Sequence, residues 1–312
     1  MRYLVTGGAG FIGSNTVDEI VRRGHSAVVL DDFSAGREEN LKQWAGKIEI
    51  VRGSITDLPT VQKACEGADY VIHLAAQTSV PRSVGDPIES NHVNIDGTLN
   101  VLVAARDAKV RRLVYAASCA AYGEALIQPQ RESMCADPIS PYGVTKFVGE
   151  LYAKVFGRCY GLETVSLRYF NVFGPRQDPT SAYSGVLSKF ITTLLADGQP
   201  VIFGNGDQSR DFIFVENVVQ ANLLACEAQN CSERTFNIGT GNRYTLNEIL
   251  RLLEKISRKK TAAKYEPPRS GDILHSQADI TEAQKSLGYD PKINFEEGLR
   301  RTWEWYRSSL SK

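Results

Sequence analysis

The sequence predicts an α/β protein in which a doubly wound parallel sheet is followed by a smaller C-terminal α/β lobe. Apolar strand segments alternate with amphipathic helical segments, glycines follow the first strand, and the alternation loosens after residue 171. Strands that alternate with helices pair in parallel, and helices then cover both faces of the sheet. A chain of 312 residues also exceeds the size at which a single core stops growing. We therefore expect one lobe over residues 1–170, with a returning segment near 210–240, and a second over 171–312, with a ligand cleft between them.

The positions of the elements follow from the period of the apolar residues, which differs between strands and helices. Strands are expected at residues 3–5, 26–30, 48–51, 70–74, 112–116, 164–168, 200–203 and 235–238. Helices are expected at 14–23, 58–65, 89–107, 141–160, 185–196, 216–228, 246–258 and 295–310. Thr245 is expected to cap the helix that begins at residue 246. In such sheets ligands bind beyond the carboxyl ends of the strands, so residues just after each strand are the first site candidates.

The composition limits the classes of partner. Basic and acidic side chains both number 36, so the charge gives no reason to expect nucleic acid or an anionic membrane surface. No apolar run approaches the roughly 18 residues that a membrane span needs, and the chain enters a strand without a leader, so we expect a cytoplasmic protein. The six cysteines form no CxxC pair and no zinc-type spacing with histidine, and we expect neither a metal site nor disulfides.

A glycine-rich turn follows the first strand. Gly7, Gly10 and Gly13 lie where the strand gives way to a helix, and residues without a Cβ let backbone N–H groups approach a pyrophosphate. The second strand ends on Asp31, about 20 residues later, where a carboxylate accepts hydrogen bonds from an adenosine ribose. A turn-forming role beside Asp32 is the alternative. The pattern predicts a dinucleotide site, and it favours NAD over NADP because a carboxylate repels a 2′-phosphate.

A second constellation lies on the helix expected at 141–160. Tyr142 and Lys146 are four residues apart and therefore share one face of that helix. A lysine ammonium near a phenol lowers the pKa of the phenol, so Tyr142 could exchange a proton with a sugar or alcohol hydroxyl. Ser118, at the end of a strand, is expected to hydrogen-bond the same oxygen. This spacing also arises by accident in amphipathic helices, but together with a dinucleotide turn it predicts an acid–base centre.

Ordered motifs along almost the whole chain resemble one family. They are TGGAGFIG (6–13), HLAA (73–76), Ser118 with Tyr122 and Gly123, Tyr142 with Lys146, RYFNVFGPRQ (168–177), RDFIFVEN (210–217), FNIGTG (236–241) and RSGD (269–272). The chain resembles the extended short-chain dehydrogenase/reductases, Rossmann-fold enzymes that act on nucleotide sugars, and most closely the NAD-dependent UDP-hexose 4-epimerases. In that family the tyrosine removes the 4-hydroxyl proton while hydride passes from C4 to NAD. The 4-keto sugar then turns and takes the hydride back on its other face.

The resemblance implies a role for individual residues. The catalytic residues are expected to be Ser118, Tyr142 and Lys146. NAD is expected to contact Gly7, Gly10, Phe11, Ile12, Gly13, Asp31, Asp32, Ser34, Ser54, Ile55, Leu74, Ala75, Ala76, Tyr142, Lys146 and Tyr169. A UDP-sugar is expected to contact Ser79, Ser118, Asn171, Lys189, Arg210, Arg269, Asp272 and Ser276. Residues 171–312 would then bind the UDP-sugar, and the helices at 89–107 and 141–160 would pair in a homodimer.

Some of these residues have an alternative explanation. Arg210 and Arg269 carry forked donors that suit a diphosphate, whereas a surface ion pair, such as Arg210 with Asp211, is the other possibility. For Lys189 a solvated surface position explains the residue as well as a phosphate contact does. His73 is expected to be a structural residue at the end of its strand rather than a base.

Other reactions of the same fold remain open on the sequence. A 4,6-dehydratase needs a carboxylate pair after the strand-end hydroxyl, where this chain has Cys119, Ala120 and Ala121. A UDP-glucuronate epimerase or decarboxylase needs an arginine for the substrate carboxylate, and Arg82 is the candidate. A non-catalytic NAD-binding sensor would usually lack the tyrosine–lysine pair or a glycine, and all of these are present.

The choice of sugar depends on Ser276. By resemblance this position lies near the C2 substituent of the sugar, and glucose-restricted epimerases carry a tyrosine there. A serine leaves room for an N-acetyl group. The loop at 79–83 and the run FNVFGPRQDP also resemble epimerases of UDP-N-acetylglucosamine and UDP-N-acetylgalactosamine. We therefore expect interconversion of these two sugars, with UDP-glucose and UDP-galactose as further substrates.

Overall fold

The computed structural model describes residues 1–178, 185–268 and 273–310. A seven-stranded sheet has the order β11-β6-β5-β4-β1-β2-β3, and every neighbouring pair in it is parallel. Its strands are β1 (Arg2–Thr6), β2 (Ser26–Asp31), β3 (Glu49–Arg52), β4 (Tyr70–His73), β5 (Arg112–Ser118), β6 (Glu163–Tyr169) and β11 (Arg234–Ile238). This is the doubly wound α/β arrangement that the sequence predicts.

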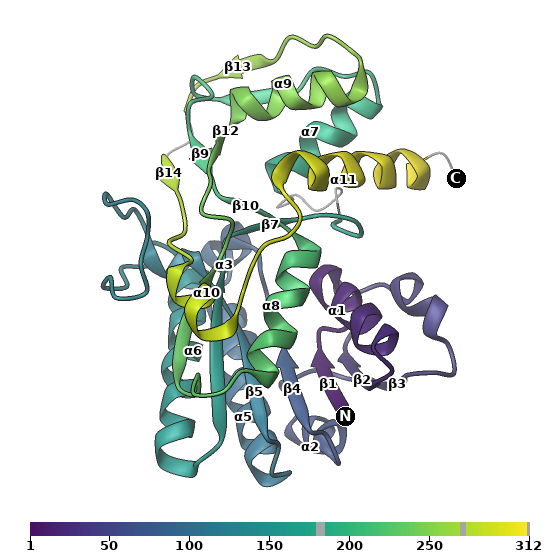
Figure 1. The fold of residues 1–312 in the computed structure, drawn as a ribbon, viewed down its shortest axis with the longest axis vertical. Coiled ribbons are helices and arrows are strands. Elements are labelled where there is room, and N and C mark those ends of the chain that lie inside the picture. Colours follow the sequence, from purple (N-terminus) through teal and green to yellow (C-terminus); the bar gives the residue numbers. More distant parts are fainter. Residues whose placement is uncertain (179–184, 269–272, 311–312) are drawn as a thin grey trace.

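Helices cover both faces of this sheet. They are α1 (Phe11–Arg22) and α8 (Val215–Glu227) on one face, and α2 (Leu58–Cys65), α5 (Gly97–Asp107) and α6 (Pro141–Tyr160) on the other. Figure 1 shows α1 and α8 side by side over the strands. Tyr3 and Val5 of β1 belong to the core beneath α1 and α8, whereas Leu4 belongs to the opposite core, since successive side chains of a strand point to opposite faces. Burial on both faces explains the continuous apolar runs of the strands.

A smaller group of elements lies beyond the carboxyl ends of the large sheet, on the side away from the N-terminus (Figure 1). Its strands are short and pair in separate small sheets: β7 (Asn171–Phe173) with β10 (Phe212–Phe214), β8 (Val201–Phe203) with β13 (Lys264–Glu266), and β9 (Ser209–Arg210) between β12 (Tyr244–Thr245) and β14 (His275–Ser276). The helices α7 (Val186–Leu195), α9 (Leu246–Ser257) and α11 (Phe295–Leu310) pack with these strands around a third core. Phe173, Phe214 and Trp303 are buried in it.

Most expected strands and helices are present, with ends shifted by a few residues. The helix expected at 89–107 is instead α4 (Pro87–Asn91), a π-helical turn (His92–Asp96) and α5. The sequence analysis missed the 3₁₀ turns η1 (Glu38–Trp44) and η3 (Cys119–Tyr122), the helices α3 (Val80–Gly85) and α10 (Thr281–Leu287), and the short strands β7, β9, β10, β12, β13 and β14. These elements are too short for the period of their apolar residues to be recognised.

The ends of two helices differ in a way that matters for the site. Thr245 caps α9 as expected, in a capping box in which Thr245 Oγ1 accepts the Glu248 N–H and the Glu248 carboxylate accepts the Thr245 N–H. At the start of α1, by contrast, no side chain among the described residues caps the N-terminal N–H groups. The N-terminus of α1 therefore has donors that a ligand can use.

No helix in residues 1–178, 185–268 and 273–310 is long and apolar enough to cross a membrane. The same residues contain no group of three or more His, Cys, Asp and Glu side chains that could hold a metal ion. The six cysteines are free.

Candidate active site

The glycine-rich turn joins β1 to α1 at the carboxyl edge of the sheet. Gly7 has a φ of +68°, in the left-handed region that favours glycine. A Cβ at Gly7 would lie 2.9 Å from the backbone of Ala75, and a Cβ at Gly13 would lie 2.1 Å from the Gly7 carbonyl oxygen. The turn is thus packed so closely that side chains are excluded from it. Beside it, the N–H groups of Phe11 and Ile12 open α1, which is the arrangement that suits a pyrophosphate.

Asp31 ends β2 next to this turn. Its carboxylate accepts the N–H groups of Ala9 and Phe33, each at 2.8 Å. Burial raises the pKa of Asp31 above its ordinary value, while the two hydrogen bonds act in the opposite direction. A carboxylate has about four acceptor sites, so Asp31 can hold the glycine turn and still accept from a ribose. The turn-forming and ribose-binding roles, which were alternatives on the sequence, are compatible in the structure.

The end of β4 closes the other side of the turn. Thr6 Oγ1 lies 2.7 Å from His73 Nδ1, and His73 Nε2 lies 3.0 Å from Thr98 Oγ1. The N–H groups of Leu74 and Ala75 both donate to Thr6 Oγ1, at 3.2 Å. Burial lowers the pKa of His73 to about 3, so its ring is neutral at pH 7. With both ring nitrogens in hydrogen bonds, His73 braces the strand ends.

Five other cofactor candidates lie at the same edge of the sheet. Ser34 donates to Asp32 Oδ1 at 2.6 Å, so the two residues form one small turn after β2. Ser54 and Ile55 follow β3, and Ile55 is buried against α5. The half-buried Ala76 continues the chain beyond β4.

Tyr169 is placed differently from the other cofactor candidates. It is the last residue of β6, and its side chain is buried in the core beneath α8. Its hydroxyl donates to Asn222 Oδ1 at 2.5 Å. The side chain is thus engaged in the core, and a contact from Tyr169 to NAD would have to come from its backbone.

Ser118 and Tyr142 come together where β5 and α6 meet. The Ser118 hydroxyl accepts the Ala120 N–H at 3.1 Å, and its hydrogen bond with the Tyr142 phenol lowers the pKa of that phenol. The backbone N–H of Tyr142 donates to Ser83 Oγ at 3.0 Å. Ser140 caps α6, which fixes the first turn of the helix that carries Tyr142. The sequence analysis missed Ser83, which belongs to the unrecognised helix α3.

Lys146 lies one turn further along α6, and its side chain is buried. Its Nζ donates to the Ala116 carbonyl oxygen at 2.8 Å and lies 5.1 Å from the centre of the Tyr115 ring. The expectation that the ammonium lowers the pKa of Tyr142 is wrong for this structure, because burial raises that pKa to about 12. The ammonium is directed at a carbonyl and not at the phenol. Burial also lowers the pKa of Lys146, to about 8, so Lys146 is mostly protonated at pH 7.

Asn94 is a further residue that the sequence analysis missed. It lies in the π-helical turn, which is a feature often found at functional sites. Its Nδ2 donates to Thr145 Oγ1 and to the Gln77 carbonyl, both at 3.0 Å, and its Oδ1 accepts the Gln77 N–H at 2.8 Å. Thr145 lies between Tyr142 and Lys146, so Asn94 ties the catalytic helix to the loop after β4. An asparagine inside a helix, where it is a poor helix former, is the one signal in the sequence.

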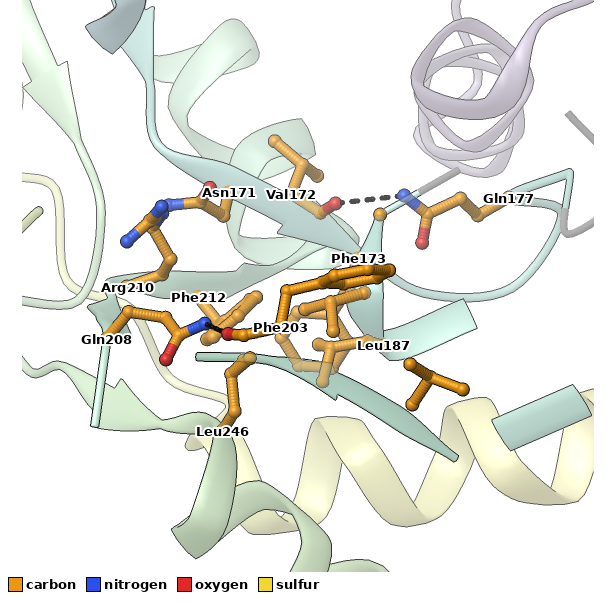
Figure 2. Close-up of a pocket in the computed structure, with 13 residues that line it drawn as sticks. Asn171, Val172, Phe173, Gln177, Leu187, Phe203, Gln208, Arg210, Phe212 and Leu246 are labelled. Atoms are coloured by element: carbon orange, nitrogen blue, oxygen red, sulfur yellow. Dashed lines mark hydrogen bonds between the residues drawn. The ribbon is translucent and has the colours of Figure 1, made fainter. Parts of the chain in front are cut away.

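A cavity of about 350 Å³ lies among β7, β9, β10 and α7. Figure 2 shows Asn171 and Arg210 next to each other at one end of it, and Phe173, Phe212 and Leu187 among the apolar side chains of its wall. Asn171 Nδ2 donates to the Asp211 carbonyl at 3.0 Å, which holds the amide against β9. A mostly apolar cavity with a cation and an amide at one end suits a base attached to phosphates.

Cys119 follows Ser118 as the first residue of η3. Burial raises the pKa of its thiol to about 11, and the nearby Arg210 guanidinium opposes that shift. The same thiol is close enough to the Tyr142 phenol to raise the pKa of the phenol. Ser118 pairs with Tyr169 at the ends of β5 and β6, two residues before Asn171, so the cavity and the Ser118–Tyr142 pair lie at the same edge of the sheet.

Ser276 and Asp211 are neighbours of Arg210, which lines the cavity. Ser276 in β14 pairs with Arg210 in β9, and its carbonyl accepts the Asp211 N–H at 2.8 Å. The Ser276 side chain is 5% exposed, and its hydroxyl has no hydrogen-bond partner within the described ranges. A buried hydroxyl without a partner costs free energy, which suits a residue that meets a polar ligand.

The remaining substrate candidates have unequal support. Ser79 is half-buried and caps α3, where its hydroxyl accepts the Arg82 N–H at 3.1 Å. The side chain of Lys189 is exposed on α7, which agrees with the surface alternative. Arg269 and Asp272 lie outside the described residues.

The fold and the site together define a dinucleotide-dependent enzyme of the Rossmann type, with a hydrogen-bonded serine–tyrosine pair and a cavity at the same edge of the sheet. A family model described as "NAD dependent epimerase/dehydratase family" matches residues 3–239. A UDP-glucose 4-epimerase of Mycolicibacterium smegmatis is 39% identical over 312 residues, which cover 99% of each chain. The chain belongs to the NAD-dependent epimerase/dehydratase family, and its cofactor is NAD.

Two solved structures are similar over nearly the whole chain. UDP-glucose 4-epimerase from Thermotoga maritima, solved with UDP-glucose, has a TM-score of 0.94 and 40% identity, covering 99% of this chain and 100% of that one. UDP-N-acetylglucosamine 4-epimerase from Methanobrevibacter ruminantium, in complex with UDP-N-acetylmuramic acid, has a TM-score of 0.95 and 39% identity, covering 99% and 98%.

Proposed function

We propose that this protein is a UDP-hexose 4-epimerase that interconverts UDP-N-acetylglucosamine and UDP-N-acetylgalactosamine, with UDP-glucose and UDP-galactose as additional substrates. Residues 1–170, with a return near 210–240, form the NAD lobe, and residues 171–312 form the UDP-sugar lobe. The single observation that carries the proposal is the cavity with Asn171 and Arg210 at one end, at the same edge of the sheet as the Ser118–Tyr142 pair. A UDP-sugar has the base, the diphosphate and the hydroxyl that such a site can hold at once.

The residues of this chain divide the work of the proposed reaction. Tyr142 takes the 4-hydroxyl proton and later returns it, and the Ser118 hydroxyl aligns the same oxygen. Bound NAD supplies a reversible hydride acceptor, and its oxidised ring carries a positive charge that favours a phenolate. Arg210 and Asn171 hold the diphosphate, so the keto sugar can turn without leaving. The glycine turn and Asp31 hold the cofactor, which in an epimerase is regenerated within each turnover.

The alternatives of the same family are less well supported. Elimination of water needs carboxylates after Ser118, and the 3₁₀ turn there presents Cys119, Ala120 and Ala121. A substrate carboxylate would need Arg82, but this side chain is exposed and lies 4.0 Å from Glu89. A sensor role does not account for a tyrosine whose hydroxyl, backbone and helix cap are all fixed. We therefore prefer epimerisation of a neutral hexose.

The choice of an N-acetylated sugar rests on Ser276. Its hydroxyl is buried without a partner in the described chain, and its position in β14 places it beside Arg210. A serine leaves space where a tyrosine would fill it, and the free hydroxyl can hydrogen-bond an amide. Purified protein should be incubated separately with UDP-glucose, UDP-galactose, UDP-N-acetylglucosamine, UDP-N-acetylgalactosamine and UDP-glucuronate, and the products separated by chromatography. We expect turnover of the first four, and failure of both N-acetylated sugars would refute the choice of substrate.

A single substitution tests the same point. Ser276→Tyr should lower kcat/KM for the N-acetylated sugars by about 100-fold, since a bulky ring fills the space for the acetamido group. kcat/KM for UDP-glucose should change by less than about threefold. Ser276→Ala is the matched control, because it removes the hydroxyl and keeps the space. Equal losses for all sugars in Ser276→Tyr would contradict the assignment.

We also propose that the protein is a homodimer. Apolar side chains are exposed along one side of α6 and on the neighbouring α4: Val144, Leu151 and Val155 are 44–48% exposed and Ile88 is 81% exposed. Positions 144, 151 and 155 lie on one face of a helix, so a second copy could cover them. Light scattering should give about twice the 34.4 kDa of one chain.

A further inference from the structure

We propose that the buried ion pair between Glu150 and Arg168 is the positioning unit for Lys146: it seats α6 against the sheet and keeps the Lys146 ammonium charged. The proposal rests on the proposed function and on the role that the family resemblance implies for Lys146, a contact with NAD one helical turn from Tyr142. Glu150 follows Lys146 by four residues, so both side chains lie on the same face of α6. Arg168 comes from β6, where it pairs with Ala117 of β5, directly before Ser118. The pair thus connects the helix that carries Tyr142 and Lys146 to β6, the strand next to the one that carries Ser118.

The geometry of the pair is that of a forked arginine on a carboxylate. Arg168 Nε donates to Glu150 Oε1 at 2.9 Å, and Nη2 donates to Oε2 at 2.8 Å. The two side chains are 5% and 4% exposed. A buried pair with two parallel hydrogen bonds is rigid, and it allows few positions of α6 on the sheet. Gly149 adds to this, since a Cβ there would lie 2.1 Å from the Tyr115 hydroxyl.

The other groups around Lys146 leave Glu150 as the carboxylate that acts on it. Tyr142 shares α6 with Lys146, Tyr115 faces it from β5, and His73 faces it from β4 with a neutral ring. Burial is the main effect on the Lys146 ammonium and lowers its pKa to about 8, while the Glu150 charge opposes that shift. Without Glu150 we therefore expect Lys146 to lose its proton at a lower pH.

Arg168 in turn keeps Glu150 ionised. Burial raises the pKa of Glu150, whereas the hydrogen bonds and charge of Arg168 lower it. Arg168 also lies over the Tyr122 ring, 4.6 Å from its centre, and one of its nitrogens, Nη1, is buried without a hydrogen-bond partner in the described chain. The guanidinium is thus in contact with the Tyr122 ring, and its Nε and Nη2 atoms face the Glu150 carboxylate. The three charges therefore act in sequence: Arg168 stabilises the ionised form of Glu150, and the Glu150 carboxylate stabilises the protonated form of Lys146.

The central variant is Glu150→Gln, which keeps the shape of the side chain and removes its charge. Its matched control is Glu163→Gln. Glu163 pairs with Arg112 at 2.6 Å, and these residues come from β6 and β5 at the opposite end of the sheet. Each variant removes the carboxylate from an arginine–glutamate pair that includes a residue of β6. Only Glu150 shares the face of α6 that carries Lys146.

The first measurement is kcat for a UDP-sugar between pH 6 and 10. In Glu150→Gln the alkaline limb should move to lower pH by about one unit or more, because Lys146 loses its proton earlier. KM should change by less than about threefold, and Glu163→Gln should keep the wild-type limb. The proposal would be overturned if Glu150→Gln folds and keeps the wild-type dependence of kcat on pH, so that the only change is a lower free energy of unfolding.

The second measurement does not require activity, so it separates this proposal from the proposed function. A lysine whose folded pKa lies near 8, below its ordinary 10.5, makes the folded state bind fewer protons than the unfolded state in that interval. The free energy of unfolding then rises with pH from about 8 to 10.5. In Glu150→Gln the rise should begin at a lower pH, and in Glu163→Gln it should not move. If Glu150→Gln does not fold, two variants of Arg168 replace it. The pH at which the free energy of unfolding begins to rise should stay at the wild-type value in Arg168→Lys and move in Arg168→Met. The same pH in both variants would refute the proposal.

Discussion

The cofactor end and the substrate end of this molecule each depend on a buried aspartate, but they use it differently. Asp31 accepts two backbone N–H groups, from Ala9 and Phe33. Asp211 accepts four hydrogen bonds, from the backbone of Thr240, Gly241 and Ala278 and from the Thr240 hydroxyl. Since a carboxylate has about four acceptor sites, Asp31 keeps capacity for a ligand and Asp211 keeps none.

The difference reflects how the two halves are built. At the cofactor end the backbone ladder of a seven-stranded sheet already positions the turn, so Asp31 and the N-terminus of α1 can be left open for a ligand. At the substrate end β9, β12 and β14 are two residues long, too short to hold one another. There Asp211 joins the segments in place of a ladder. Open hydrogen-bond capacity is therefore found in the first half, where the ligand contacts are proposed, and filled capacity in the scaffold of the second.

The largest effect is expected at the open end, for Gly13→Ala. The new Cβ would lie 2.1 Å from the Gly7 oxygen and 2.7 Å from Gly8 Cα, so the turn must move apart. We expect at least about a 100-fold loss of NAD affinity and of kcat, because the pyrophosphate contacts depend on this packing. The NAD content can be measured by chromatography of the nucleotide released from the denatured protein. The Kd for UDP, measured by calorimetry, should stay within about threefold of the wild-type value.

The matched control for this change is Gly85→Ala. A Cβ at Gly85 meets no atom within 4 Å, and its φ is not left-handed, so this variant should bind NAD normally. Wild-type NAD content in Gly13→Ala would contradict the role of the turn. A parallel loss of UDP binding would contradict the separation of the two ends.

A smaller effect is expected at the filled end, for Asp211→Asn. The side-chain amide of the new asparagine directs its own N–H groups at backbone N–H donors. At least one backbone donor then has no acceptor, which costs about 1–3 kcal/mol of stability. We expect UDP to bind about 10- to 100-fold more weakly and KM for UDP-sugars to rise, since Asn171 and Ser276 are held by the backbone of Asp211. NAD content should be unchanged. Asp207→Asn, an exposed change in the same lobe, is the control, and a loss of NAD equal to that of UDP would show that Asp211 serves the whole fold.

The sequence could predict the cofactor end because its signals are local. Gly13 and Asp31 follow strands whose apolar runs are recognisable, and Tyr142 and Lys146 share a helix whose ends are marked by Pro141 and Gly161. The confirmed capping box at Thr245 is also a local pattern. In each case a few neighbouring residues contain all the information.

The substrate end could not be predicted to the same depth because its contacts join distant segments. Asp211 meets residues 240, 241 and 278, and Glu150 meets Arg168 from another element. No period or spacing reveals such partners. The pKa of Tyr142 was missed for a related reason: helix spacing gives the face that Tyr142 shares with Lys146, but not the burial that raises the pKa of the phenol. It also does not give the Ala116 carbonyl that accepts a hydrogen bond from the Lys146 ammonium.

The smallest effect is expected for Thr245→Ala. This change removes the N-cap of α9 and leaves backbone N–H groups without a partner, but it does not create a binding site for a ligand. The change removes the acceptor for the Glu248 N–H and one half of the capping box, and should lower the free energy of unfolding by about 1 kcal/mol in urea titrations. Thr245→Ser keeps the hydroxyl and should recover most of that loss. Binding of NAD and UDP should be unchanged, because an uncapped N-terminus binds phosphate only where the fold brings the ligand to it, as at α1. Weaker UDP binding in Thr245→Ala, at wild-type stability, would show that the cap of α9 belongs to the substrate site and that filled capacity does not distinguish scaffold from ligand contact.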